Sequence, residues 1–146
     1  MFNINVLKEL LPFSNSLNIL FVEDNNIVRD QTIKMLKKIF QNIDSANNGK
    51  EGLLKYNNFN ENNNSFYDIV ITDLSMPIMN GVELSKEILN KNSSQKLIIL
   101  SAHTESKEFI SLRNLRNYKF IQKPIEQEAL LDTLLGTIKE LKTIHN

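Results

Sequence analysis

Five polar side chains of this chain stand at the ends of short apolar runs. They are the neighbouring acids Glu23 and Asp24, the acid Asp73, the hydroxyl of Ser101 and the amine of Lys123. Three carboxylates in one cleft repel one another, and a hard divalent cation such as Mg²⁺ is the usual relief. A serine hydroxyl and a lysine ammonium donate hydrogen bonds that suit phosphoryl oxygens. The chemistry that uses all five groups is phosphoryl transfer to a carboxylate, with Asp73 as the nucleophile.

The run that ends at Asp73 is the one around which the others are arranged. It spans residues 66–73, after an Asn-rich segment and before Met76-Pro77. A continuous apolar run of this kind is typical of a strand buried on both faces, as in a parallel sheet. Ligands of open α/β sheets bind at the carboxyl ends of the strands. By its local sequence alone Asp73 is either a turn residue or a reactive group, and the other four polar groups favour the reactive group.

The apolar runs alternate with segments of helical periodicity. We predict strands over 17–22, 43–46, 66–73, 96–100 and 118–122. We predict helices over 26–40, 50–59, 81–90, 105–115 and 126–144, with Asp24 or Asn25 as the N-cap of the first. Five alternating strand–helix pairs predict an α/β doubly wound fold, in which a five-stranded parallel sheet carries helices on both faces. A fragment of a larger α/β domain is the alternative.

Three further segments lead to expectations of their own. Residues 1–16 are predicted to form an N-terminal arm or short helix that stops at Pro12, ahead of one domain over 17–146. Six of the nine residues 57–65 are Asn, and this segment is predicted to form a surface loop. The last predicted helix carries apolar residues on more than one stripe, although a helix on one sheet face needs only one. We expect part of this excess to meet a partner or a second copy of the chain.

The composition narrows the classes of protein and partner. The 146 residues contain 17 Lys and Arg against 17 Asp and Glu, so no overall positive field favours nucleic acid. There is no Cys, which excludes disulfides, thiolate metal sites and cysteine nucleophiles. No apolar run reaches the roughly 20 residues of a membrane span, and the first residues lack the pattern of a secretory signal. We therefore expect a cytoplasmic protein that binds neither nucleic acid nor membrane.

Over about residues 17–144 the chain resembles the receiver domains of two-component response regulators, the chemotaxis regulators among them. Five pieces in order carry the resemblance: Ile19-Leu20-Phe21-Val22-Glu23-Asp24-Asn25, Tyr67-Asp68-Ile69-Val70-Ile71-Thr72-Asp73-Leu74-Ser75-Met76-Pro77, Asn80-Gly81, Ile98-Ile99-Leu100-Ser101-Ala102-His103 and Phe120-Ile121-Gln122-Lys123-Pro124. The resemblance implies the flavodoxin-like fold with strand order 2-1-3-4-5. It also implies a phosphorylation-controlled signalling switch, and not an enzyme with a separate substrate.

The resemblance assigns roles in metal binding and phosphorylation. It implies that Asp73 accepts a phosphoryl group from a sensor histidine kinase or a phosphotransfer protein. It also implies that Mg²⁺, or Mn²⁺ in its place, is held by Asp24, Asp73 and the backbone carbonyl of Ser75. Glu23 stands where many relatives have Asp, and its implied role is to act on the metal through a bound water.

The resemblance assigns further roles to residues that respond to the phosphoryl group. Ser101 is the implied switch hydroxyl, and Lys123 is the implied partner of the phosphoryl oxygens. Phe120 takes the place of the family's rotating aromatic residue. The peptide bond before Pro124 is expected to be cis, as it is in the family.

By the same resemblance, two residues tune the hydrolysis of the phosphoaspartate and one surface transmits the signal. Ser75 and His103 match the tuning positions. The implied output surface is formed by the receiver's fourth helix, fifth strand and fifth helix, here 105–115, 118–122 and 126–144. A homodimer through that surface is a possible arrangement.

Two alternatives from other classes remain open. The first is a receiver-like docking module that is never phosphorylated. The second is a phosphatase of the haloacid dehalogenase type, which also uses an Asp nucleophile and Mg²⁺. That family needs a second Asp two residues after the nucleophile, and this position is Ser75 here.

Overall fold

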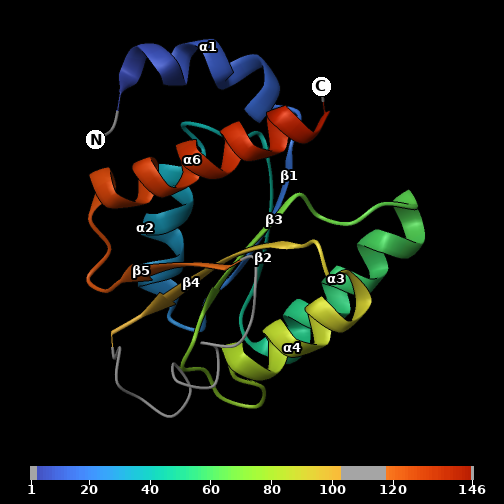
Figure 1. Ribbon diagram of the computed structural model, residues 1–146. Helices are drawn as coiled ribbons and strands as arrows, with labels where there is room; N and C mark the ends of the chain where they lie inside the picture. The colour runs from blue at the N-terminus through green and yellow to red at the C-terminus, as the bar shows by residue number, and fades with distance from the viewer. Residues whose placement is uncertain (1–2, 103–117, 146) are drawn as a thin grey trace.

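Five strands form the centre of the molecule (Figure 1). The computed structural model describes residues 3–102 and 118–145. The strands are β1 (Asn18–Val22), β2 (Asn42–Ala46), β3 (Ile69–Asp73), β4 (Lys96–Ser101) and β5 (Tyr118–Gln122). Every neighbouring pair is parallel, and the order across the sheet is β2-β1-β3-β4-β5. The predicted doubly wound, flavodoxin-like fold and its strand order are confirmed.

Helices cover both faces of this sheet. They are α1 (Ile4–Ser14), α2 (Asn26–Leu36), α3 (Gly49–Asn63), α4 (Gly81–Lys91) and α6 (Gln127–His145). In Figure 1, α2 and α6 lie on one side of the sheet, α3 and α4 lie on the other, and α1 lies alongside α6. The helix predicted over 105–115 lies outside the described residues.

The strands separate two apolar cores because their side chains alternate between the two faces. Ile19 and Phe21 of β1 belong to the core under α2 and α6, and Leu20 and Val22 belong to the core under α3 and α4. All residues of β3 are buried, as predicted for a strand covered on both faces. Because both faces are covered by helices, the strand ends and their loops are where a ligand can reach the sheet.

The Asn-rich segment is mostly helical, so the prediction of a loop over 57–65 was wrong. α3 continues to Asn63, and Asn64 ends it in the left-handed conformation, with a φ angle of 54°. Asn is a weak helix former, but most helical stability in proteins comes from tertiary packing. Phe59 of α3 stacks on Tyr67 with their ring centroids 4.1 Å apart. This packing outweighs the local composition.

α1 also runs further than predicted, because it passes through Pro12 and ends at Ser14. The proline removes one hydrogen-bond donor from the helix. Other hydrogen bonds hold the turn that follows. The backbone N–H of Asn15 donates to the carbonyl of Leu11 at 2.9 Å, and the Ser14 hydroxyl donates to the carbonyl of Ile39 at 2.7 Å. The local penalty of Pro12 is therefore offset by contacts beyond the helix.

The wide apolar face of α6 is covered by the chain itself. α1 packs along α6, and Leu10 of α1 belongs to the same core as six apolar residues of α6: Leu130, Leu131, Leu134, Leu135, Ile138 and Leu141. The most exposed of these six, Leu141, is only 7% exposed. These six residues are therefore covered within the chain, whereas Ala129 of the same helix is exposed, and the expectation that a partner or a second copy meets part of this helix stays a prediction.

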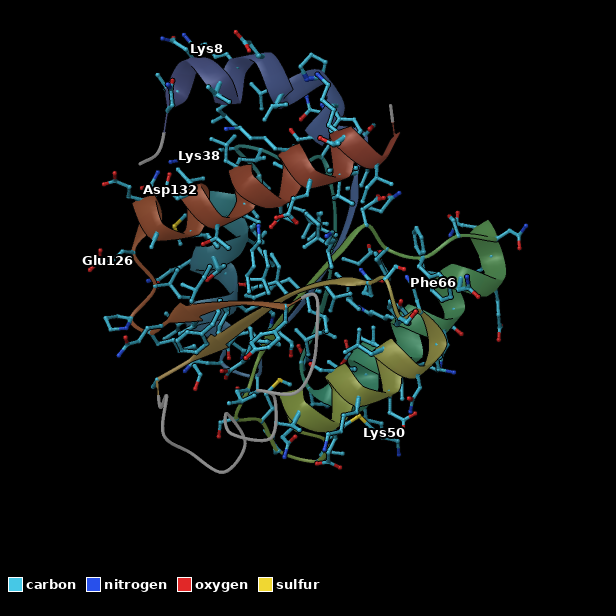
Figure 2. All side chains as sticks on the ribbon, viewed as in Figure 1. Lys8, Lys38, Lys50, Phe66, Glu126 and Asp132 are labelled. Carbon is cyan, nitrogen blue, oxygen red and sulfur yellow. The ribbon has the colours of Figure 1, made fainter. Side chains whose placement is uncertain are left out.

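Charged side chains lie on the outside of these layers. Four of them are exposed and are labelled in Figure 2: Lys8 of α1, Lys38, Lys50 of α3 and Glu126. Across the described residues, no helix combines the length and the apolar character that crossing a membrane requires.

Two serine hydroxyls are equally buried but differ in their hydrogen bonds, and they lead to opposite predictions for stability. Ser14 and Ser85 are both 0% exposed. The Ser14 hydroxyl donates to Ile39, whereas the Ser85 hydroxyl has no partner among the described residues. We expect Ser85→Ala to raise the free energy of unfolding by about 1 kcal/mol, because it removes an unsatisfied hydroxyl. We expect Ser14→Ala to lower it by about 1–2 kcal/mol, because it orphans a buried carbonyl.

Urea unfolding followed by circular dichroism measures both changes. The two variants serve as matched controls, since each removes one buried hydroxyl. A loss of stability in Ser85→Ala as large as that in Ser14→Ala would show that the Ser85 hydroxyl is satisfied in solution.

Candidate functional site

The parallel register brings the ends of four strands to one edge of the sheet. Val22 pairs with Thr72, Asp73 with Leu100, and Ser101 with Gln122. The residues that end these strands or directly follow them therefore lie at the same level: Glu23, Asp73, Ser101 and Lys123. All of the predicted polar groups in the described residues thus belong to this edge.

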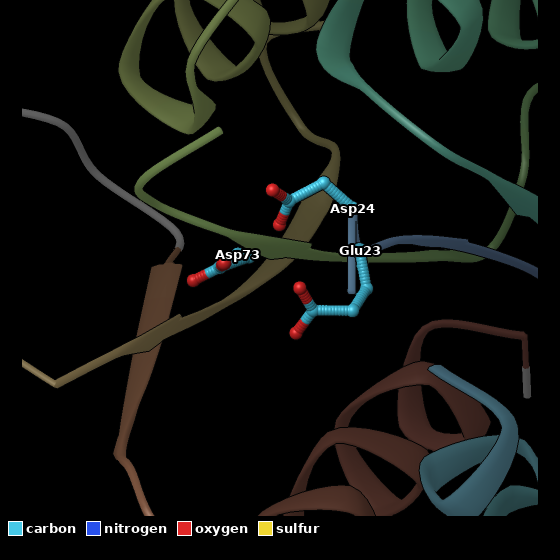
Figure 3. Close-up of side chains that lie close together, drawn as sticks. All are labelled: Glu23, Asp24 and Asp73. Carbon is cyan, nitrogen blue, oxygen red and sulfur yellow. The ribbon is translucent and has the colours of Figure 1, made fainter. Parts of the chain in front are cut away.

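Three carboxylates form an acidic cluster at this edge. Glu23, Asp24 and Asp73 each offer a carboxylate oxygen, and these oxygens all lie within 4.8 Å of one another. Figure 3 shows the three groups facing a common space at the ends of β1 and β3. Glu23 is fully buried and Asp73 is 6% exposed, whereas Asp24 is exposed. The cluster is therefore open to solvent on the side of Asp24 and closed behind it.

Lys123 joins the two buried members of this cluster. Its ammonium lies 2.9 Å from Glu23 Oε1 and 3.2 Å from Asp73 Oδ2. Its backbone N–H donates to the carbonyl of Ser101 at 2.9 Å, which aligns the end of β5 with the end of β4. Burial favours the neutral amine, but the hydrogen bond to Glu23 and the charge of Asp73 outweigh it, so the pKa of Lys123 lies above its usual value. Lys123 is therefore a charged partner of both acids.

Both carboxylate oxygens of Glu23 are already engaged. Oε1 accepts from Lys123, and Oε2 accepts from the backbone N–H of Asn25 at 3.2 Å. Burial raises the pKa of the Glu23 carboxyl, and the bond from Lys123 opposes this rise. Asn25 is also the N-cap of α2, because its side chain accepts from the backbone N–H of Val28 at 3.0 Å. Of the two caps considered from the sequence, Asn25 is the one observed.

The loop after Asp73 is held in place because the backbone at Gly81 lies close to the backbone of Asp73 and Leu74. The N–H of Gly81 donates to the carbonyl of Leu74 at 2.8 Å, and the N–H of Leu74 donates to Leu100 at 2.9 Å. A Cβ atom on Gly81 would overlap the carbonyl oxygen of Asp73. Gly81 is thus a structural requirement of the site, whereas in the sequence it marked only a helix start and one of the five pieces that carry the family resemblance.

The remaining predicted site residues differ in how the structure places them. Ser101 is buried at 4% exposure, and Phe120 is partly buried on β5. Ser75 is exposed in the loop that follows Asp73. The bond before Pro124 is cis, as expected. His103 lies outside the described residues.

The donor set of this edge fits a hard cation. Its members are carboxylates, and Mg²⁺ is typically held by one or two carboxylates together with waters and phosphate oxygens. Transition metals that favour imidazole or thiolate find no such ligand in this cluster. Asp24 and Asp73 would hold the cation, since Asp24 is open to solvent and Asp73 lies next to it.

Comparison with known proteins identifies the family. The family model of the response regulator receiver domain matches residues 19–135. The chain therefore belongs to the receiver domains of two-component response regulators, which are signalling switches.

Individual proteins are similar to this chain over most of its length. The chemotaxis protein CheY of Listeria monocytogenes is 29% identical over 119 residues, which cover 81% of this chain and 95% of that protein. The "Probable transcriptional regulator ycf29" of Porphyra purpurea is 27% identical over 125 residues, which cover 84% of this chain but only 57% of that protein. The N-terminal domain of an uncharacterised protein from Wolinella succinogenes has a similar structure, with a TM-score of 0.76 and 30% identity. That match covers 90% of this chain and 100% of the other.

Proposed function

We propose that this receiver domain is a phosphorylation-controlled switch with Asp73 as its phosphoacceptor. The observation that carries the proposal is the position of Lys123, which lies within 3.2 Å of a carboxylate that also belongs to a three-acid cluster. A phosphoryl group on Asp73 would meet a cation already in place. Asp24 leaves the cluster open on one side, where a donor can approach.

The transfer follows from the chemistry of these groups. An oxygen of Asp73 attacks the phosphorus of a phosphohistidine on a sensor kinase or a phosphotransfer protein. The new P–O bond forms as the P–N bond breaks, and the imidazole nitrogen leaves with the electron pair. Mg²⁺, or Mn²⁺ in its place, supplies positive charge that offsets the charge of the phosphoryl oxygens. Asp24, Asp73 and the backbone carbonyl of Ser75 are the ligands that we propose for it.

Glu23 has a different role from Asp24 in this proposal. Its oxygens are engaged by Lys123 and by the Asn25 N–H, so a direct bond to a metal would replace one of these contacts. We assign Glu23 to the water shell of the cation and to the orientation of Lys123. This division agrees with burial, since Glu23 is closed off and Asp24 is exposed.

The switch acts through the neighbouring strands. The phosphoryl group draws the Ser101 hydroxyl and the Lys123 ammonium toward it, because both are donors to its oxygens. Space released near Ser101 lets Phe120 turn inward, and this biases the surface of the last helix, strand and helix of the receiver. Ser75 and His103 set the rate at which the phosphoaspartate is hydrolysed. A partner, an output domain or a second copy of the chain reads the altered surface.

Beryllofluoride binding tests the proposal and separates it from a docking module. Beryllofluoride adds to a carboxylate as a phosphoryl analogue, and we expect it to bind only when Mg²⁺ is present. Fluorine NMR of the protein with beryllium and fluoride, with and without MgCl₂, reports the bound species directly. The same titration with Lys123→Met is the control, and we expect weaker binding because the ammonium partner is lost. Binding that fails in wild type even with Mg²⁺ would favour the docking module.

A further inference from the structure

Arg29 makes two hydrogen bonds at the start of α2. Its Nη1 donates to the main-chain carbonyl of Glu23 at 2.9 Å, and its Nη2 donates to the side-chain oxygen of Asn26 at 2.6 Å. The carbonyl of Glu23 belongs to the peptide unit that joins Glu23 to Asp24. Arg29 therefore contacts the backbone between two of the three acids.

That peptide unit lies just past the end of the sheet. The last paired residues of β1 and β2 are Val22 and Ala46, and the N–H of Glu23 still donates to the carbonyl of Ala46 at 3.1 Å. The carbonyl of Glu23 accepts instead from Arg29. The guanidinium is planar, so its second bond, to the exposed Asn26 side chain, helps to fix its orientation toward the Glu23 carbonyl.

The orientation of this peptide matters most for Asp24. Glu23 is held by Lys123 and by the Asn25 N–H, but Asp24 is exposed and its side chain takes its direction from the backbone. A rotation of the peptide would turn the Asp24 carboxylate away from Asp73, although the two now offer oxygens within 4.8 Å of each other.

We propose that Arg29 is a positioning residue of the cation site. By holding the Glu23–Asp24 peptide, it keeps the Asp24 carboxylate facing Asp73 and open to a divalent cation. The inference rests on the proposed function in one respect, namely that a divalent cation binds to this cluster.

The positive charge of Arg29 and its proposed positioning role predict opposite changes in Mg²⁺ affinity when Arg29 is replaced. A guanidinium beside a cation site repels the incoming cation, so its removal by charge alone would tighten Mg²⁺ binding. If Arg29 positions the site, Arg29→Met weakens Mg²⁺ binding by roughly tenfold, which is the lower end of the range for losing a residue that holds a metal ligand in place. Arg29→Lys keeps the charge but lacks the planar fork, and we expect it to weaken binding in the same direction.

Isothermal titration calorimetry with MgCl₂ at constant ionic strength measures the dissociation constants of wild type, Arg29→Met and Arg29→Lys. Lys34→Met is the matched control, because it removes one positive charge from the last turn of α2, and we expect its affinity to equal that of wild type. Urea unfolding without Mg²⁺ accompanies each titration. A purely structural role for Arg29 would lower stability and leave the Mg²⁺ affinity of the folded protein unchanged.

The outcomes separate this inference from the proposed function. If wild type binds Mg²⁺ and both Arg29 variants bind it equally well or more tightly, the positioning role is overturned and the switch stands. If wild type itself does not bind Mg²⁺, both proposals fail. If Arg29→Met does not fold, Arg29→Lys decides, because it differs from wild type only in the shape of the cation.

Discussion

Asp73→Asn is expected to abolish the incorporation of phosphate into this chain. The amide matches the carboxylate in size and stays at the end of β3, but it lacks the charged oxygen that attacks phosphorus. Lys123 loses one carboxylate partner and keeps the other, Glu23 at 2.9 Å. We therefore expect the variant to fold, so that the loss reflects chemistry and not unfolding.

A small phosphodonor such as phosphoramidate, with MgCl₂, tests this without a cognate kinase. Phosphate-affinity gel electrophoresis measures the labelled fraction, and its loss in acid or hydroxylamine identifies an acyl phosphate. Asp30→Asn is the matched control, because it makes the same change at an exposed position of α2. We expect this control to label like wild type. Labelling of Asp73→Asn at the wild-type level would assign the phosphoacceptor to another residue.

Gly81→Ala is expected to cause the largest loss of stability among single methyl additions in the described site. The added Cβ would overlap the carbonyl oxygen of Asp73 and would lie 2.8 Å from the Cα of Leu74. Both atoms belong to the backbone, so no side-chain rotation relieves the clash. We expect the free energy of unfolding to fall by about 3 kcal/mol, the upper part of the range for overpacking. Because the strained atoms adjoin Asp73, beryllofluoride binding should weaken as well.

Gly136→Ala is the matched control for this prediction. Gly136 lies inside α6, and the one described atom outside the helix backbone that a Cβ there would approach within 4 Å is the terminal nitrogen of Lys119, at 3.3 Å. That end of a flexible side chain can move aside. Since glycine inside a helix costs about 0.5–1 kcal/mol relative to alanine, we expect Gly136→Ala to stabilise the protein by that amount. Chemical unfolding of both variants measures the contrast, and a loss of equal size in both would contradict the steric argument.

The grouping of polar side chains at one edge of the sheet was predicted from the sequence because its signals are local. A strand buried on both faces is a continuous apolar run, and the polar residue that ends the run is visible in the sequence. Parallel strands then place their ends together, whatever the details of packing. This is why Glu23, Asp73, Ser101 and Lys123 could be grouped before any distance was known.

The limits of the helices were predicted less well, because they depend on distant contacts. α3 continues through the Asn-rich segment since Phe59 stacks on Tyr67. α1 continues past Pro12 since the Ser14 hydroxyl bonds to Ile39. Each of these contacts joins residues that the local pattern treats separately, and the stability of a helix in a protein comes mostly from such packing.

The sequence by itself determined the class of fold, the order of the strands through its family resemblance, and the set of polar residues at their ends. Only the tertiary structure decided how those residues are coupled. The bond from Lys123 to Glu23 joins positions 100 residues apart, and the cover of α1 on α6 joins the two ends of the chain. The contact of Arg29 with the Glu23 carbonyl depends on how α2 leaves β1. Composition and periodicity report which face of an element is buried, but distances between side chains follow only from the way the elements pack.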